Sequence, residues 1–166
     1  MVNIHDIPAE ARWEMATRAA DTLPMAYYAA FRSVTGGTYE KELEKALASV
    51  WSGAGEEQGA IARAFAIPVR NAKEIAEAFR TISVIFLGPE LVGGIQEEGD
   101  RAVLTTTQCP MVSRTSKFGL PGESVCRSCA AYCTSAVKSL NPAYALRNVK
   151  GMCLGDPICE MRIQKK

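Results

Sequence analysis

CLGDPICEMRI, residues 153–163, predicts a β-hairpin near the C-terminus of this chain. The tripeptide Gly-Asp-Pro at 155–157 is typical of a tight turn, and polar residues alternate with apolar ones after it. If this tripeptide is the turn, Cys153 lies directly opposite Cys159, with Cβ atoms about 4.5–5.5 Å apart on one face of the hairpin. Met161 shares that face, so we expect the two cysteines to point into the core.

The segments before the hairpin complete a small antiparallel sheet and one long helix. Two stretches rich in β-branched residues flank a turn sequence at 97–100. A loop rich in Gly and Pro follows, and the helix after it ends at Asn141-Pro142. Four antiparallel strands with helices to one side form an α+β domain. The expected elements are strands at 91–95 and 101–107, a helix at 124–140, and strands at 145–154 and 158–163.

The first half is predicted to be a helical scaffold. Its apolar residues recur at helical spacing, with charged residues between them. Pro24 and the glycines within 53–55 are expected to interrupt helices, because both residue types are unfavourable in a helix interior. We therefore expect a single domain over 1–166, with a helical half at about 1–88 and a half of strands and cysteines at about 89–166. The expected helices cover 9–23, 25–34, 38–52, 57–66 and 71–88.

Composition and charge exclude several classes of function. The 19 basic and 18 acidic side chains leave a formal net charge of +1, and no stretch concentrates Lys and Arg, so we expect no nucleic-acid partner. No segment reaches the roughly 18 consecutive apolar residues that cross a bilayer, so we expect no membrane partner. The N-terminus lacks the pattern of a secretory signal, which predicts a cytoplasmic protein. An exposed apolar helix face within residues 9–87 would favour a homodimer.

All six cysteines lie at or after Cys109, which makes a thiol site the main functional candidate. In a reducing compartment a framework of structural disulfides is not expected. Cys126, Cys129 and Cys133 are spaced i, i+3 and i+7, so they project from one face of a helix. With Ser124 as the helix N-cap, Cys126 would stand in the first turn, where the helix dipole favours a thiolate.

The helix and the hairpin together offer five sulfur ligands for a metal ion. Four thiolates around zinc form a closed structural site, whereas three leave a position for water or substrate. An iron–sulfur cluster on the helical cysteines with Cys109 is an alternative, although the spacing is not that of a ferredoxin. Each cysteine can instead be a small buried hydrophobic residue. The candidate metal ligands are Cys126, Cys129, Cys133, Cys153 and Cys159, and the preferred four omit Cys126.

Cys109 is also a candidate catalytic nucleophile. It precedes Pro110, which stops the strand ladder, and a sulfur at a strand end can face a helix N-terminus. The only histidine, His5, lies near the N-terminus, so a Cys–His pair is poorly supported. A carboxylate such as Asp156 or Glu160, or a water molecule, would have to act as the base.

The hairpin sequence resembles the closing Gly-Asp-x-x-Cys hairpin of the 4-vinyl reductase domain family. The longer pattern of Cys109-Pro110, helical cysteines and Gly155-Asp156 resembles the related L-2-amino-thiazoline-4-carboxylic acid hydrolase family over about residues 95–164. The resemblance implies a sheet with helices packed on it, a pocket between them and, often, dimerisation. In zinc-containing relatives an acidic residue before the last hairpin also binds the metal. Here no carboxylate fills that position, which is occupied by Arg147, Asn148 or Lys150.

Three functions follow from these features. The first is a small-molecule-binding or sensing domain, in which a thiolate-bound zinc ion fixes the C-terminal hairpin and a small organic ligand occupies an apolar pocket. The second is a hydrolase acting on a cyclic amidine or thiazoline substrate through a metal-bound water or Cys109. The third is an iron–sulfur or thiol redox protein that uses Cys126 and Cys129.

Overall fold

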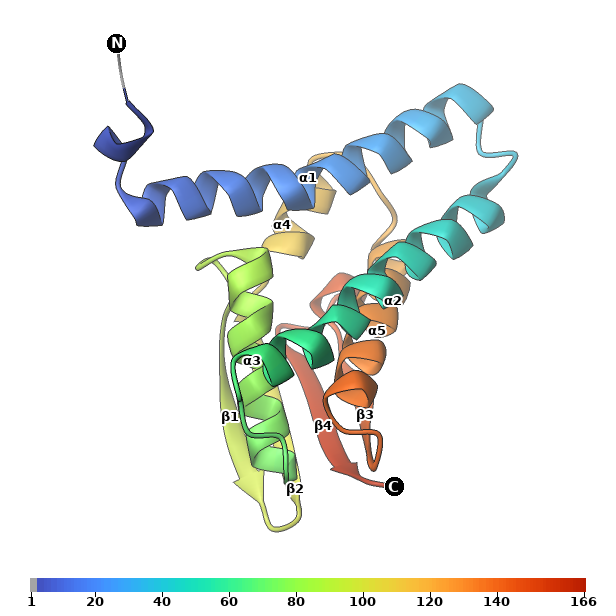
Figure 1. Cartoon of the computed structure of the whole chain (residues 1–166). Coiled ribbons are helices and arrows are strands. Elements are labelled where there is room, and N and C mark those ends of the chain that lie inside the picture. The colour runs from blue at the N-terminus through green and yellow to red at the C-terminus, as the bar shows by residue number, and fades with distance from the viewer. Residues whose placement is uncertain (1–2) are drawn as a thin grey trace.

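The computed structural model describes residues 3–166 as a four-stranded antiparallel sheet with helices packed against it (Figure 1). The α+β class and the helical first half are as the sequence predicts. In the described part of the chain, no helix is both long and apolar enough to cross a membrane. The elements are η1 (Ile4–Asp6), α1 (Ala9–Thr35), α2 (Glu40–Ala64), α3 (Ala72–Leu87), β1 (Val92–Glu98), β2 (Arg101–Gln108), α4 (Pro110–Ser116), α5 (Gly122–Leu140), β3 (Tyr144–Lys150), η2 (Met152–Leu154) and β4 (Cys159–Lys165).

The sheet presents one apolar face to α3 and α5. Its strand order is β1-β2-β4-β3, and every neighbouring pair is antiparallel. Leu104 of β2 pairs with Met161 of β4, and Ala102 pairs with Ile163, and all four side chains are buried. Successive strand residues point to opposite faces, so these alternate residues form a single inner face. They join apolar side chains of α3 and α5, among them Ile82, in the main core.

The expected break at Pro24 does not occur, and α1 is one helix of 27 residues. A proline inside a helix costs about 3 kcal/mol, because it lacks an N–H donor and clashes with the preceding turn. Burial of the next turn opposes this cost, because Met25 and Tyr28 are almost fully buried. On the other side of Pro24, Asp21 pairs with Arg114 of α4 and so fixes where α1 lies. Tertiary packing therefore overrides the local signal.

The expected break at Gly53 and Gly55 is also absent, and α2 continues from Glu40 to Ala64. Gly55 lies against α5, where an added Cβ atom would overlap the backbone oxygen of Tyr132. Glycine there allows the two helix backbones to approach closely. Its role is in packing rather than in ending a helix.

The segment after β2 differs from the expected loop. Pro110 is the first residue of α4, a short helix in a region where the sequence predicts a loop. Proline suits this position because the first N–H of a helix has no intrahelical partner. Helix α5 then begins at Gly122, two residues before Ser124, so Cys126 lies beyond the first turn and the dipole argument for its thiolate fails.

The C-terminal hairpin is wider than a tight turn at 155–157. Strand β3 ends at Lys150, which pairs with Glu160, and Cys153 lies in the 3₁₀ turn η2 instead of in a strand. The expected pairing of Cys153 opposite Cys159 is therefore wrong. The loop closes because the carboxylate of Asp156 accepts a hydrogen bond from the backbone N–H of Gly151 at 2.8 Å.

Candidate functional site

A cavity of ≈ 200 Å³ lies between the inner face of the sheet and helices α3 and α5. Its wall includes Phe79 of α3, Leu104 of β2, Tyr132 of α5 and Met161 of β4. The loop between β3 and β4 closes one side of it. The lining is predominantly apolar, and the cavity is the chain's best candidate for a ligand site.

All six cysteines line this one cavity. Cys126, Cys129 and Cys133 reach it from one face of α5, as their helical spacing predicts. Cys159, which is the first residue of β4, also lines the cavity. Cys109, predicted to be a nucleophile or a ligand of the alternative iron–sulfur cluster, lines the cavity from the N-cap position of α4.

Several of the sulfur atoms lie close to one another or to the backbone of the last hairpin. The Sγ atoms of Cys129 and Cys133 are 3.7 Å apart. The sulfur atoms of Cys126 and Cys153 both lie beside Gly151, within 4 Å of where a Cβ atom on that residue would stand. The sulfur of Cys159 instead accepts the backbone N–H of Met152 at 3.3 Å. The cysteines of α5 and of the hairpin therefore gather around the same cavity.

Cys129 is exposed although it lies on a helix that packs inside the molecule. Its side chain is solvent-accessible, although α5 packs between the sheet and α2. We attribute this exposure to the cavity surface, because Cys129 and the buried Cys133 both line its wall. The thiol of Cys129 is therefore accessible to a molecule inside the cavity.

The environment keeps four of the thiols neutral. Burial raises the pKa of Cys109 to about 11, against the opposing effect of backbone N–H groups of α4. Burial also raises the pKa of Cys153 and of Cys159, and neighbouring thiols add to the shift. The contact with Cys133 raises the pKa of Cys129 well above its usual value. Without a bound cation these four groups are thiols at pH 7, which are weak nucleophiles.

The thiols do not form a ready-made metal site. Among residues 3–166, no three Cys, His, Asp or Glu side chains converge closely enough to hold a metal ion. Zinc bound by the five cysteines of α5 and the hairpin, and the alternative iron–sulfur cluster, therefore stay predictions of the sequence, as does catalysis by Cys109.

A buried polar network beside the cavity was not predicted from the sequence. The hydroxyl of Tyr132 accepts a hydrogen bond from Nε2 of Gln58 at 2.5 Å and lies 3.1 Å from Oγ of Ser83. The ring of Trp51 meets Tyr132 edge-on, with centroids 6.1 Å apart. The network joins α2, α3 and α5, because each helix contributes one polar side chain. It could not be predicted, since a single polar residue in an apolar stripe does not reveal which residues it will contact.

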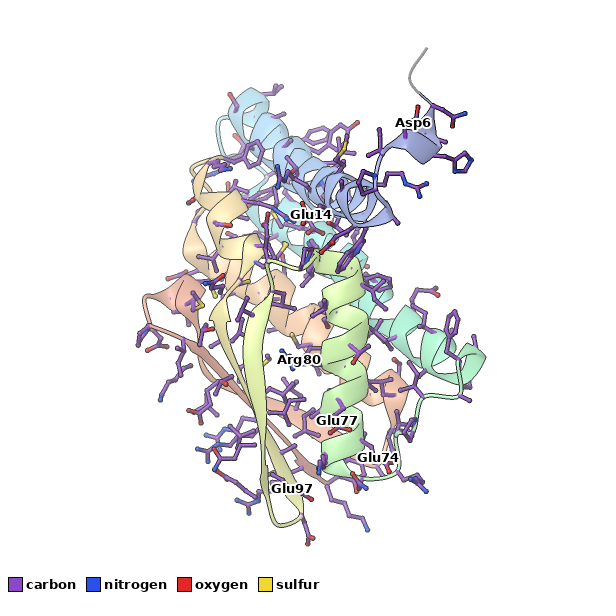
Figure 2. All side chains as sticks on the ribbon, turned by 90° about the vertical axis from the view of Figure 1, so that its left-hand side faces the viewer. Asp6, Glu14, Glu74, Glu77, Arg80 and Glu97 are labelled. Carbon is purple, nitrogen blue, oxygen red and sulfur yellow. The ribbon has the colours of Figure 1, made fainter. Side chains whose placement is uncertain are left out.

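Three charged residues stand at the rim of the cavity. Lys150 pairs with Glu160 at 3.2 Å, and Asp156 is held by the backbone of Gly151. Figure 2 shows Arg80 on the side of α3 that faces β1, and within the described residues its guanidinium has no carboxylate partner within 4.0 Å. The rim is thus polar, whereas the interior is apolar and rich in sulfur.

Two solved structures share the fold over most of this chain. One is a trafficking protein particle complex subunit 3 from Naegleria fowleri, covalently bound to palmitic acid, with a TM-score of 0.55 and 12% identity over 88% of this chain and 95% of that one. The other is the phenol-responsive sensory domain of the transcription activator PoxR with phenol, with a TM-score of 0.57 and 12% identity over 90% of this chain and 74% of that one. No family model matches the sequence, and neither does any curated protein.

Fold and site together define an α+β domain with a sulfur-lined cavity between its sheet and its helices. Its fold is the one found in the trafficking subunit and in the PoxR sensory domain. At 12% identity these likenesses concern the fold alone, so membership of the 4-vinyl reductase or thiazoline hydrolase family stays a prediction.

Proposed function

We propose that this protein binds a small apolar organic molecule with an aromatic ring in the cavity beneath its sheet. The observation that carries the proposal is the cavity itself, ≈ 200 Å³ in volume with an apolar lining. An apolar cavity of roughly 150 Å³ in another protein is large enough to bind benzene. The volume therefore suits a single substituted ring better than a long acyl chain.

The sulfur atoms on the wall favour an aromatic ligand. Two methionines, Met111 and Met161, line the cavity together with the six cysteines. A sulfur atom near an aromatic ring contributes about 0.3–1.5 kcal/mol, and neutral thiols can make such contacts without the cost of burying a charge. Arg80 at the rim can receive a polar or anionic substituent of the ring.

The bound molecules of the two similar structures are consistent with this proposal. Palmitic acid and phenol each combine an apolar body with a polar end. The ligand class nevertheless rests on this chain's own cavity, because the sequence identity is too low to transfer a binding specificity.

Cys129→Phe tests the proposal by filling the cavity from the middle of α5. Thr134→Phe is the matched control, because Thr134 is exposed on the same helix and does not line the cavity. Calorimetric titration with phenol should show one site per chain in the wild type and in Thr134→Phe, whereas palmitic acid should bind more weakly because its acyl chain is too long for the cavity. Phenol binding should be lost in Cys129→Phe. Equal affinity of the filled variant for phenol, or no binding of phenol to the wild type, would contradict the proposal.

A further inference from the structure

One pair of thiols on the cavity wall is held at a fixed separation by its helix. Cys129 and Cys133 lie one turn apart on α5, and their Sγ atoms are 3.7 Å apart. Both side chains line the cavity, and the thiol of Cys129 is exposed to it whereas Cys133 is buried. Two sulfur atoms therefore stand side by side at the edge of an apolar space.

This pair cannot close into a disulfide while α5 stays helical. The Cβ atoms of residues four apart on a helix are about 5–6 Å from each other, whereas a disulfide needs Cβ atoms about 3.5–4.5 Å apart. Oxidation would have to distort α5 in the region where its buried residues Tyr132 and Ala136 join the main core. The packing of α5 therefore keeps the two thiols in their reduced form.

A single atom can bridge the two sulfurs without moving the helix. A bond between a thiolate sulfur and zinc is about 2.3 Å long. Two bonds of this length span the 3.7 Å between the Sγ atoms at an angle close to that of a tetrahedron, so the pair suits a bent bridge rather than a linear one. The pair offers only two ligands, because no three metal-ligating side chains converge among residues 3–166, whereas a structural zinc ion takes four.

The cavity also favours a bridge that carries no charge. Its wall includes Leu104 and Met161, and a buried charge without a partner is costly. The contact with Cys133 raises the pKa of Cys129 well above its usual value, so Cys129 keeps its proton at pH 7. A ligand that reacts with two neutral thiols and gives a neutral product avoids the cost that a divalent cation would meet here. Trivalent arsenic with one organic substituent has this chemistry.

We propose that Cys129 and Cys133 bind an aromatic trivalent arsenical, with the arsenic bonded to both sulfurs and its ring in the cavity. In the hydrated compound the arsenic carries one ring and two hydroxyl groups. Two As–O bonds break and two As–S bonds form, and each hydroxyl leaves with one thiol proton as water. The arsenic remains trivalent, so no oxidant or reductant is needed. The position of the ring rests on the proposed function, because the same cavity of ≈ 200 Å³ has to admit an aromatic group.

Phenylarsine oxide, followed by mass spectrometry of the intact chain, tests the bridge. The reduced wild type should gain one phenylarsenic group and lose two hydrogens, and the adduct should survive millimolar glutathione, which is a monothiol. Cys129→Ala should weaken binding by about 10²–10⁴-fold, because the second bond no longer forms within one molecule. Cys126→Ala is the matched control, since Cys126 lines the same cavity from the same helix, and it should keep the adduct. If Cys129→Ala fails to fold, Cys133→Ala replaces it.

Phenol added in the same experiment separates this inference from the proposed function. Excess phenol should slow the modification, and the adduct should abolish phenol binding, because both rings occupy one cavity. Phenol binding without a glutathione-resistant adduct would overturn the arsenical site and leave the proposed function intact. An adduct on a chain that does not bind phenol would support the bridge but contradict the proposed function. An adduct kept by Cys129→Ala and lost by Cys126→Ala would overturn the assignment to Cys129 and Cys133.

Discussion

Gly53 and Gly55 stand two residues apart in α2, and the same substitution should change the stability of the protein in opposite directions at the two positions. An alanine at Gly53 would meet no atom within 4 Å. An alanine at Gly55 would overlap the backbone oxygen of Tyr132 and approach the backbone nitrogen of Ala136 to 2.9 Å. Both contacts are with backbone atoms of α5, which cannot rotate away as a side chain can.

The expected magnitudes follow from these two environments. Replacing a helical glycine with alanine stabilises a helix by about 0.5–1 kcal/mol, and Gly53→Ala should gain this amount. Overpacking a core costs about 1–3 kcal/mol, so Gly55→Ala should lose roughly 1–2 kcal/mol after the same helical gain is subtracted. At about 2–4 °C per kcal/mol for a chain of this size, the two melting temperatures should move apart by roughly 3–12 °C.

Urea denaturation followed by far-ultraviolet circular dichroism measures both changes. The midpoint should rise for Gly53→Ala and fall for Gly55→Ala with a similar slope, because the same surface is exposed on unfolding. Stabilisation by both substitutions would refute the close contact of α2 with α5. Gly55→Ala should also weaken phenol binding, since displacing α5 moves the cavity wall.

Three further predictions concern buried polar and thiol groups. Tyr132→Phe removes the hydroxyl that contacts both Gln58 and Ser83. It should lower the free energy of unfolding by about 1–3 kcal/mol in the same urea assay. An unchanged midpoint would argue against the network. Burial raises the pKa of Asp21 from 3.8 to about 6, which means that the folded protein favours the protonated carboxyl group. The stabilisation that comes from this protonated group is fully present below pH 4 and is lost as pH rises through 6. Asp21→Asn should remove this part of the pH dependence in thermal melts from pH 4 to 7, and an identical profile would contradict the shift. Burial raises the pKa of Cys109 to about 11, so Cys109 should react with iodoacetamide at pH 7.5 about a hundredfold more slowly than an ordinary thiol. Peptide mass spectrometry measures this rate of alkylation. Comparable rates would show that the thiol of Cys109 is not desolvated.

Local features of the fold could be predicted from the sequence. The apolar periodicity places α3 correctly, and in the structure the side chain of Asn71 caps this helix by accepting the N–H of Glu74. The spacing of the three α5 cysteines also gave their common face, because helical periodicity depends only on neighbouring residues. Local composition likewise identified strands, from β-branched residues in the first hairpin and from alternating residues after Pro157.

Features that depend on distant contacts were not predictable. Pro24 and Gly55 look like helix breakers in isolation, and only the packing of α1 on α4 and of α2 on α5 shows that they lie inside helices. The register of the last hairpin depends on the bond from Gly151 to Asp156, which a turn tripeptide does not reveal. The cavity and the arrival of Cys109 at its wall likewise depend on how the helices meet the sheet.

The most direct test of the central proposal is the methionine methyl spectrum of the protein labelled with ¹³C at those methyl groups. Met111 and Met161 line the cavity, whereas Met15 is 64% exposed on α1. Added phenol should shift the signals of Met111 and Met161, give nuclear Overhauser contacts from its ring protons to both methyl groups, and leave Met15 unchanged. Shifts confined to Met15, or no shift at any methionine at saturating phenol, would contradict binding in the cavity.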